Sequence, residues 1–141
     1  MTAKEYLGQA YRIDARINSK LEQIASLQAL ATKATSTLHH DIVQSSSMSR
    51  SMAGTIDKMI DLQTEINNDI DNLVDTKREI ASVIKSIQNP EHQTILELRY
   101  LCFKSWEQIA EALGYSTQHV FRFHTRALDC VKVPKVESKC D

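Results

Sequence analysis

Residues 105–128 read SWEQIAEALGYSTQHVFRFHTRAL, and the architecture of the C-terminal part of the chain follows from them. Ser105, with Gln108 three residues later, forms a capping box that begins a helix. Gly114 ends this helix, because glycine readily adopts the positive φ of a helix C-cap. Ser116 then caps a second helix. Two short helices joined by a tight, glycine-containing turn predict a helix-turn-helix unit.

The two helices of this unit have distinct inner and outer faces. The residues predicted to face inward are Trp106, Ile109, Ala110, Leu113, Val120, Phe123, Ala127 and Leu128. The outward residues of the second helix are Thr117, Gln118, Phe121, Arg122, Thr125 and Arg126. This face carries hydrogen-bonding groups near its start and cations further along, as in helices that read bases and contact phosphates. The pattern predicts a surface for double-stranded DNA.

Charge is distributed unevenly along a chain that is almost neutral as a whole. The 17 Lys and Arg residues stand against 18 Asp and Glu residues, so the overall composition does not indicate nucleic acid. Between residues 116 and 135, however, four cations stand against Asp129 alone. His119 and His124 are expected to add positive charge there below neutral pH. Local charge therefore favours DNA binding by the second helix.

Two segments with apolar residues seven positions apart precede this unit. They run from about residue 3 to 38 and from about residue 51 to 87, and a serine-rich stretch at 39–50 separates them. The seam residues include Ile17 and Ile24 in the first segment and Met59, Ile66, Leu73 and Ile80 in the second. Such heptads are typical of helices that wrap around a partner helix, and dense serine favours a flexible connection. We expect a long antiparallel, coiled-coil-like hairpin, formed within one chain or between two.

The charges of the two segments suggest a register for this hairpin. Pairing positions whose numbers sum to 90 places Ile17 against Leu73 and Ile24 against Ile66. Lys20, the one polar residue of its seam, then lies alongside Asp71. Exposed ion pairs contribute only ~0.2–1 kcal/mol each, so they select the register more than they stabilise it.

A further helix is expected between the hairpin and the helix-turn-helix unit. Asn89 is a good N-cap, and Pro90 is favoured at the first helical position, so this helix runs from Pro90 to about Cys102. The fold class is therefore all-α. The predicted organisation is a helical hairpin at 1–88, a three-helix domain at 89–131 and a flexible tail at 132–141.

The stretch TILELRYLCFKSWEQIAEALGYSTQHVFRFHTRALDCV, residues 94–131, resembles region four of bacterial sigma factors. That region has a helix ending in L-R-Y, a hydrophobic turn, an S-x-E-I-A-x-x-L-G helix and a recognition helix closing with R-A-L. With its heptad segments, the whole chain is similar to small sigma-like regulators of phages and prophages of Gram-positive bacteria, the ArpU-type late transcription regulators. The resemblance implies a sequence-specific transcription regulator that acts as an activator with host RNA polymerase.

The resemblance and the outward face together define the candidate DNA-binding residues. The resemblance implies phosphate contacts by Arg99 and by the start of the helix at Ser105, and a backbone contact by Arg126. It also implies base or backbone contacts by Thr117, Gln118, Phe121 and Arg122. Phe121 departs from the family, which often has a polar or charged residue there, and the sequence leaves open whether it contacts DNA, for example a thymine methyl group, or packs against the hairpin. The complete candidate set is Arg99, Lys104, Ser105, Ser116, Thr117, Gln118, His119, Phe121, Arg122, Thr125 and Arg126.

The sequence contains little that indicates another class of function. Nothing resembles a metal-ligand set, a glycine-rich phosphate loop or a nucleophile with its base, so we expect no enzyme, metal or cofactor. The three cysteines have no paired spacing, no secretory signal is visible, and no apolar run approaches the ~20 residues of a membrane span, which favours the cytoplasm of a bacterial host.

Several alternatives stay open from the sequence. One is a phage DNA-packaging protein similar to terminase small subunits, which also combine a helix-turn-helix with helical oligomerisation. Another is a helical adaptor that binds no DNA, since a fold does not guarantee a function. A homodimer or higher oligomer is expected, but the sequence leaves open its size, the operator, activation or repression, and direct contact with polymerase.

Overall fold

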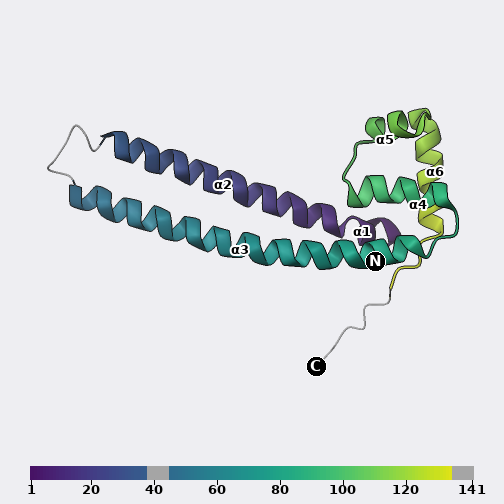
Figure 1. Ribbon diagram of the computed structural model, residues 1–141, viewed down its shortest axis with the longest axis horizontal. Helices are drawn as coiled ribbons and strands as arrows, with labels where there is room; N and C mark the ends of the chain where they lie inside the picture. Colours follow the sequence, from purple (N-terminus) through teal and green to yellow (C-terminus); the bar gives the residue numbers. More distant parts are fainter. Residues whose placement is uncertain (38–44, 135–141) are drawn as a thin grey trace, which may run out of the picture. The chain divides into compact units, whose positions relative to one another are not determined.

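The computed structural model describes the backbone of residues 1–37 and 45–134 and the side chains outside residues 34–51. Within these residues every regular element is helical, which confirms the predicted all-α class. The elements are α1 (Ala3–Leu7), α2 (Gln9–Thr37), α3 (Ser45–Lys85), α4 (Pro90–Leu96), the π-helical turn η2 (Glu97–Leu101), α5 (Trp106–Leu113) and α6 (Thr117–Asp129) (Figure 1).

The chain divides into two compact units. The first, unit 1, consists of Met1–Arg12 and Leu73–Asp141, and the second, unit 2, consists of Ile13–Asn72. The boundary predicted at residue 88 therefore falls inside unit 1, and the beginning of the chain belongs to the same unit as the C-terminal helices.

Unit 2 consists of parts of α2 and α3 that run side by side in opposite directions (Figure 1). Ile17 and Ile66 are buried between them. Lys20 Nζ lies 2.5 Å from Asp69 Oδ2 and 3.5 Å from Glu65 Oε2. The prediction that placed Lys20 beside Asp71 is therefore wrong by two residues. Asp69 follows Ile66 by three positions and so shares its helix face, whereas a residue five positions on does not.

The connection between the two long helices differs from the expectation. α3 begins at Ser45, so the second half of the stretch 39–50, predicted as flexible, is helical. Serine has only a middling helix propensity, but extending an existing helix adds one hydrogen bond per residue, and this favours continuation. The rest of the predicted connection lies outside the described residues, which resume at Ser45.

The core of unit 1 joins residues from both ends of the chain. Its buried members are Tyr6, Leu7, Ala10, Ile80, Ile84, Ile87, Leu96, Tyr100 and Ala127. Tyr6 also donates a hydrogen bond to Glu79 Oε1 at 3.0 Å, and burial together with this neighbouring carboxylate raises the pKa of Tyr6 to about 12. Val131 and Val133 pack against the same core, so packed residues continue into the predicted tail. Residues 135–141 of that tail lie outside the description.

The helix predicted from Pro90 begins as expected but ends differently. Asn89 Oδ1 accepts the Glu91 backbone N–H at 2.9 Å, with Pro90 in the first turn. From Glu97 the helix widens into η2, where the Cys102 N–H donates to the Glu97 carbonyl at 3.0 Å. Single π-helical turns of this kind are frequent at functional sites, and nothing in local helix propensity signals them.

Candidate nucleic-acid interface

The ends of α5 and the start of α6 are fixed by the side chains that the sequence singled out. Ser105 Oγ accepts the Gln108 N–H at 3.2 Å, and Gln108 Oε1 accepts the Ser105 N–H at 3.0 Å. Gly114 ends α5 with φ 71°, and Ser116 Oγ accepts the His119 N–H at 3.2 Å. These predicted caps are confirmed.

One side of α6 is held by the interior of unit 1. Val120 and Ala127 are fully buried, Val120 together with Ile109 and Ala110 of α5. The helix contacts α1, α4 and α5. These contacts fix which side of α6 faces out.

The opposite side of α6 is open to solvent. Its exposed residues are Gln118, Phe121, Arg122, Thr125 and Arg126, while Thr117 and His119 are half-buried. Among the described side chains, no carboxylate lies within ion-pair distance of Arg122 or Arg126. Both guanidinium groups are therefore available to an external anion.

Three candidate residues on α6 also contact neighbouring groups. Thr125 Oγ1 donates to the Phe121 carbonyl at 3.0 Å, which leaves its lone pairs free to accept. The Phe121 ring packs edge-on against Trp106 with the centroids 5.2 Å apart, yet 45 % of the residue is exposed. The His119 ring lies 4.5 Å from the Phe123 ring. The interface therefore carries an aromatic platform beside its amide and cations.

The remaining candidate residues lie before α5 and α6. Arg99 is in η2, Lys104 and Ser105 directly precede α5, and Ser116 directly precedes α6. The Arg99 guanidinium lies 4.3 Å from the centre of the Trp106 ring, and Nη1 donates to the Lys104 carbonyl at 3.0 Å. Guanidinium has five N–H donors, so four remain. Lys104 is exposed. Ser105 and Ser116 use their hydroxyl oxygens as caps, so an external acceptor would meet their hydroxyl protons or the helix starts.

His124 is a residue whose role the sequence did not reveal. Its ring is 7 % exposed, and Nε2 lies 2.6 Å from the Tyr100 hydroxyl oxygen. Burial, followed by the positive charges of Lys4 and Arg99, lowers the pKa of His124 to about 4. The expectation that His124 gains charge just below neutral pH is therefore wrong, because its place on the buried face of α6 disfavours the imidazolium.

The seam residues divide between full and partial burial. Ile17, Ile66 and Ile80 are buried, whereas Ile24, Met59 and Leu73 are half-buried. In the described part of the chain, no three His, Cys, Asp or Glu residues are grouped as metal ligands would be. Over the same residues, no helix combines the length and apolar character that crossing a membrane requires.

These features define an all-helical protein whose last helix presents a cationic, hydrogen-bonding face. The chain belongs to the family DUF1492, described as a protein of unknown function, whose family model matches residues 33–132. The match includes all of α3 to α6 and therefore the candidate interface. Comparison with the curated proteins and with the solved structures gave no match.

Proposed function

We propose that this protein is a sequence-specific, DNA-binding transcription regulator of phage or prophage origin that acts with host RNA polymerase. In this proposal α5 and α6 form a helix-turn-helix, and α6 enters the major groove. The observation that carries the proposal is the open side of α6, on which an amide, an aromatic ring and two unpaired guanidinium groups share one exposed face.

Each group on that face suits a different part of the duplex. Gln118, the second residue of α6, has the amide that pairs with both adenine edge atoms in the major groove. Phe121 offers an apolar surface to a thymine methyl group. Arg122 and Arg126 lie further along and suit phosphates, as does Lys104 before α5. The resemblance of residues 94–131 to sigma region four also implies DNA contacts by Gln118, Phe121, Arg122 and Arg126.

The test is selection of bound sequences from a random DNA pool, followed by binding measurements at several salt concentrations. We expect a defined consensus and an affinity that falls with salt, because phosphate contacts release counterions. The double variant Arg122→Ala, Arg126→Ala should lose binding with its helix content unchanged. The matched control, Arg16→Ala with Lys58→Ala, removes the same charge from exposed positions of unit 2 and should bind as the wild type does. Equal binding by both double variants, or no bound sequences at all, would contradict the proposal.

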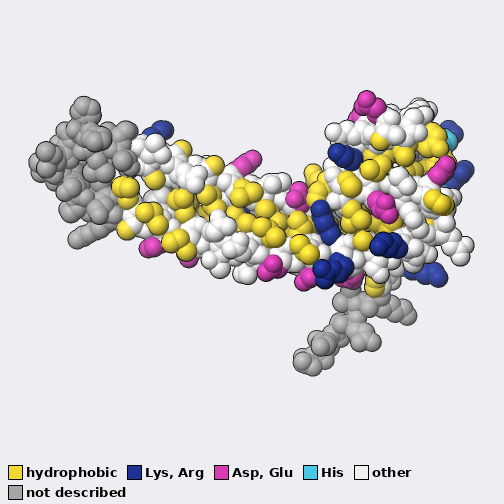
Figure 2. Space-filling view, viewed as in Figure 1, with side chains coloured by type: hydrophobic (Ala, Val, Ile, Leu, Met, Phe, Trp, Pro, Cys, Tyr) yellow, Lys and Arg dark blue, Asp and Glu magenta, His cyan; other side chains and the backbone are white. Residues whose placement is uncertain are grey.

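We also propose that α3 joins two copies of the chain. Its exposed residues Ile56, Ile60 and Ile70 in unit 2 leave apolar surface in solvent, each between 42 % and 58 % exposed. Figure 2 shows hydrophobic side chains reaching the surface along α2 and α3. Together with the exposed amides Gln63 and Asn67, these residues follow the alternating four-and-three spacing of a coiled-coil stripe.

This stripe is complementary to the same stripe of a second copy when the two helices pair antiparallel. Antiparallel pairing of positions whose numbers sum to 130 sets Ile60 against Ile70 of the second copy and Gln63 against Asn67. A twofold interface needs this kind of self-complementarity, because each residue must suit the one that it meets in the other copy. Within one chain Gln63 Nε2 donates to Asn67 Oδ1 at 3.4 Å, and the remaining donors and acceptors of the two amides pair across the interface and fix the register.

The mass in solution tests this dimer. Ile60→Glu should give a monomer, whereas Asn68→Glu, exposed on α3 beside the stripe, should leave the dimer intact. Asp57 and Asp71 flank the stripe and approach each other across the interface, so the dimer should tighten as salt screens their repulsion. A wild-type monomer at all concentrations would contradict this interface, and a ring of many subunits would favour the packaging role instead.

A further inference from the structure

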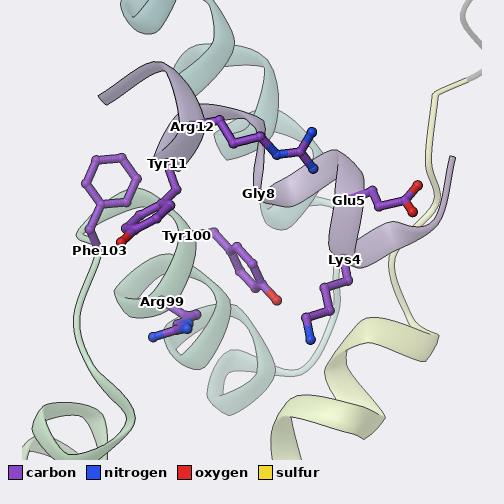
Figure 3. A pocket seen from close by; sticks show the side chains of 8 residues that line it. All are labelled: Lys4, Glu5, Gly8, Tyr11, Arg12, Arg99, Tyr100 and Phe103. Atoms are coloured by element: carbon purple, nitrogen blue, oxygen red, sulfur yellow. The ribbon is translucent and has the colours of Figure 1, made fainter. Parts of the chain in front are cut away.

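We propose that unit 1 contains a binding pocket for a mononucleotide, a ligand that combines a phosphate with a flat ring. The pocket is a cavity of about 310 Å³ between α1, the first turn of α2 and η2 (Figure 3). Its lining residues are Lys4, Glu5, Gly8, Tyr11, Arg12, Arg99, Tyr100 and Phe103. Ligand pockets range from ~300 to 1,000 Å³, so this volume suits one nucleotide and not a dinucleotide.

The charge in the pocket favours an anion. Three of its lining side chains are cations, and Lys77 adds a fourth close by, with Nζ 4.6 Å from the centre of the Phe103 ring. None of Lys4, Arg12 and Arg99 has a carboxylate within ion-pair distance among the described residues. The single acid, Glu5, uses Oε2 to accept the Thr2 N–H at 3.1 Å as part of a helix cap. Unpaired cations around a concavity concentrate anions.

The aromatic lining favours a ligand with a ring. Tyr11 and Phe103 meet edge to face with their centroids 5.6 Å apart, and Tyr100 lies between Lys4 and Arg99 in Figure 3. Flat aromatic faces stack nucleobases without regard to their sequence, and guanidinium groups beside them add cation–π attraction. Tyr11, which is 57 % exposed, offers the most open ring, because Tyr100 is 6 % exposed and stacked on His124, and Lys77 lies over Phe103. An open aromatic ring among cations is the chemistry that a nucleoside phosphate requires.

The backbone around the pocket is unusual in two ways. η2 is a π-helical turn, and Phe103 has φ 56°, a left-handed conformation that bulky residues rarely adopt. Such conformations cluster at ligand sites, where the surrounding structure holds them in place. Here they set Arg99 and Tyr100 on one wall and Phe103 on the next.

A hydrogen bond between two side chains connects the lining of this pocket to α6. Tyr100 lines the cavity, and its hydroxyl oxygen lies 2.6 Å from His124 Nε2 in α6. Occupancy that shifts Tyr100 therefore alters the surroundings of the His124 ring. The His124 imidazole resonances in an NMR spectrum provide a local report of binding, independent of any DNA.

The experiment is titration of the full chain with adenosine 5′-monophosphate and guanosine 5′-monophosphate, followed by calorimetry and by the His124 resonances. Inorganic phosphate and adenosine serve as half-ligands. We expect saturable binding of a mononucleotide, weaker binding of each half-ligand, and movement of the His124 signals. Arg12→Gln should weaken binding by about tenfold or more, the effect of losing one charge-assisted hydrogen bond.

The matched control is Arg16→Gln, which removes the same charge one turn further along α2, at an exposed position outside the lining. It should bind as the wild type does. No saturable mononucleotide binding by a folded wild-type chain would overturn the proposal, as would equal weakening by the two variants. Equal affinity for phosphate alone would overturn the role of the rings. If Arg12→Gln weakens DNA binding while no free nucleotide binds, the cations serve the DNA backbone and the pocket assignment is wrong.

Discussion

Gln118 has the side chain best placed on α6 to distinguish bases. It is exposed near the start of the helix, and no described partner contacts its amide. Replacing it with alanine should relax base preference at one position, at a cost of ~1–3 kcal/mol if the amide pairs with both adenine edge atoms. Sequence selection with Gln118→Ala checks this, with Gln88→Ala, exposed before α4, as the control. An unchanged consensus would remove Gln118 from base reading.

His124 makes the stability of the protein depend on pH. Its folded pKa of about 4 lies below the ordinary imidazole pKa of 6.5, so the unfolded chain binds a proton first as the pH falls. The stability from keeping this ring neutral is present above pH 6.5 and is lost as the pH falls towards 4. The loss should be about 2 kcal/mol, since solvent still reaches part of the site. Denaturant unfolding between pH 4 and 7 measures it, and His124→Gln should flatten this part of the profile. The same slope in both proteins would show that other groups cause it.

Two glycines in different elements should respond oppositely to alanine. Gly114 ends α5 with φ 71°, where a side chain is strained even though nothing lies within 4 Å, so Gly114→Ala should destabilise by ~1–2 kcal/mol. Gly54 lies inside α3 with nothing within 4 Å of an added Cβ, so Gly54→Ala should stabilise by ~0.5–1 kcal/mol. Thermal unfolding of both variants checks the pair. Shifts of the same sign would contradict either the left-handed conformation of Gly114 or the helical conformation of Gly54.

Sequence predicted the elements best where a few neighbouring residues determine the structure. The caps at Ser105, Gly114 and Ser116 follow from contacts within three or four residues, and all are observed. The Thr2–Glu5 capping box at the start of α1 carries the same signature. The π-helical turn and the Tyr100–His124 hydrogen bond depend on packing between distant segments, and no local pattern encodes them.

At the scale of the whole molecule, the C-terminal helices depend on the beginning of the chain. Leu7 is fully buried in the core that also holds Ile84, Leu96 and Ala127. A fragment of residues 89–134 lacks Leu7 and the end of α3, so it should not unfold cooperatively. Circular dichroism melting of the fragment and of the full chain distinguishes the two cases. A sharp transition in the fragment would show that α4 to α6 are stable alone.

The sequence located the candidate DNA face, but it did not predict the long-range packing around that face. The outward residues of α6 follow from helical periodicity, and the exposed fractions agree with that pattern at Gln118, Arg122 and Arg126. The pocket walls at Lys4 and Arg12 come from a segment almost ninety residues before η2, and a heptad pattern contains no information about such a meeting. Long-range packing therefore accounts for most of what the sequence left unpredicted.

The burial of Leu7 in one core with Ala127 also constrains when the protein can fold. α1 leaves the ribosome long before Ala127 is synthesised, so this core cannot close until Ala127 has also emerged. Until then Tyr6 and Leu7 are exposed apolar groups on a growing chain, and such groups invite aggregation. The emergence of α6 should therefore set the earliest moment at which this core can close.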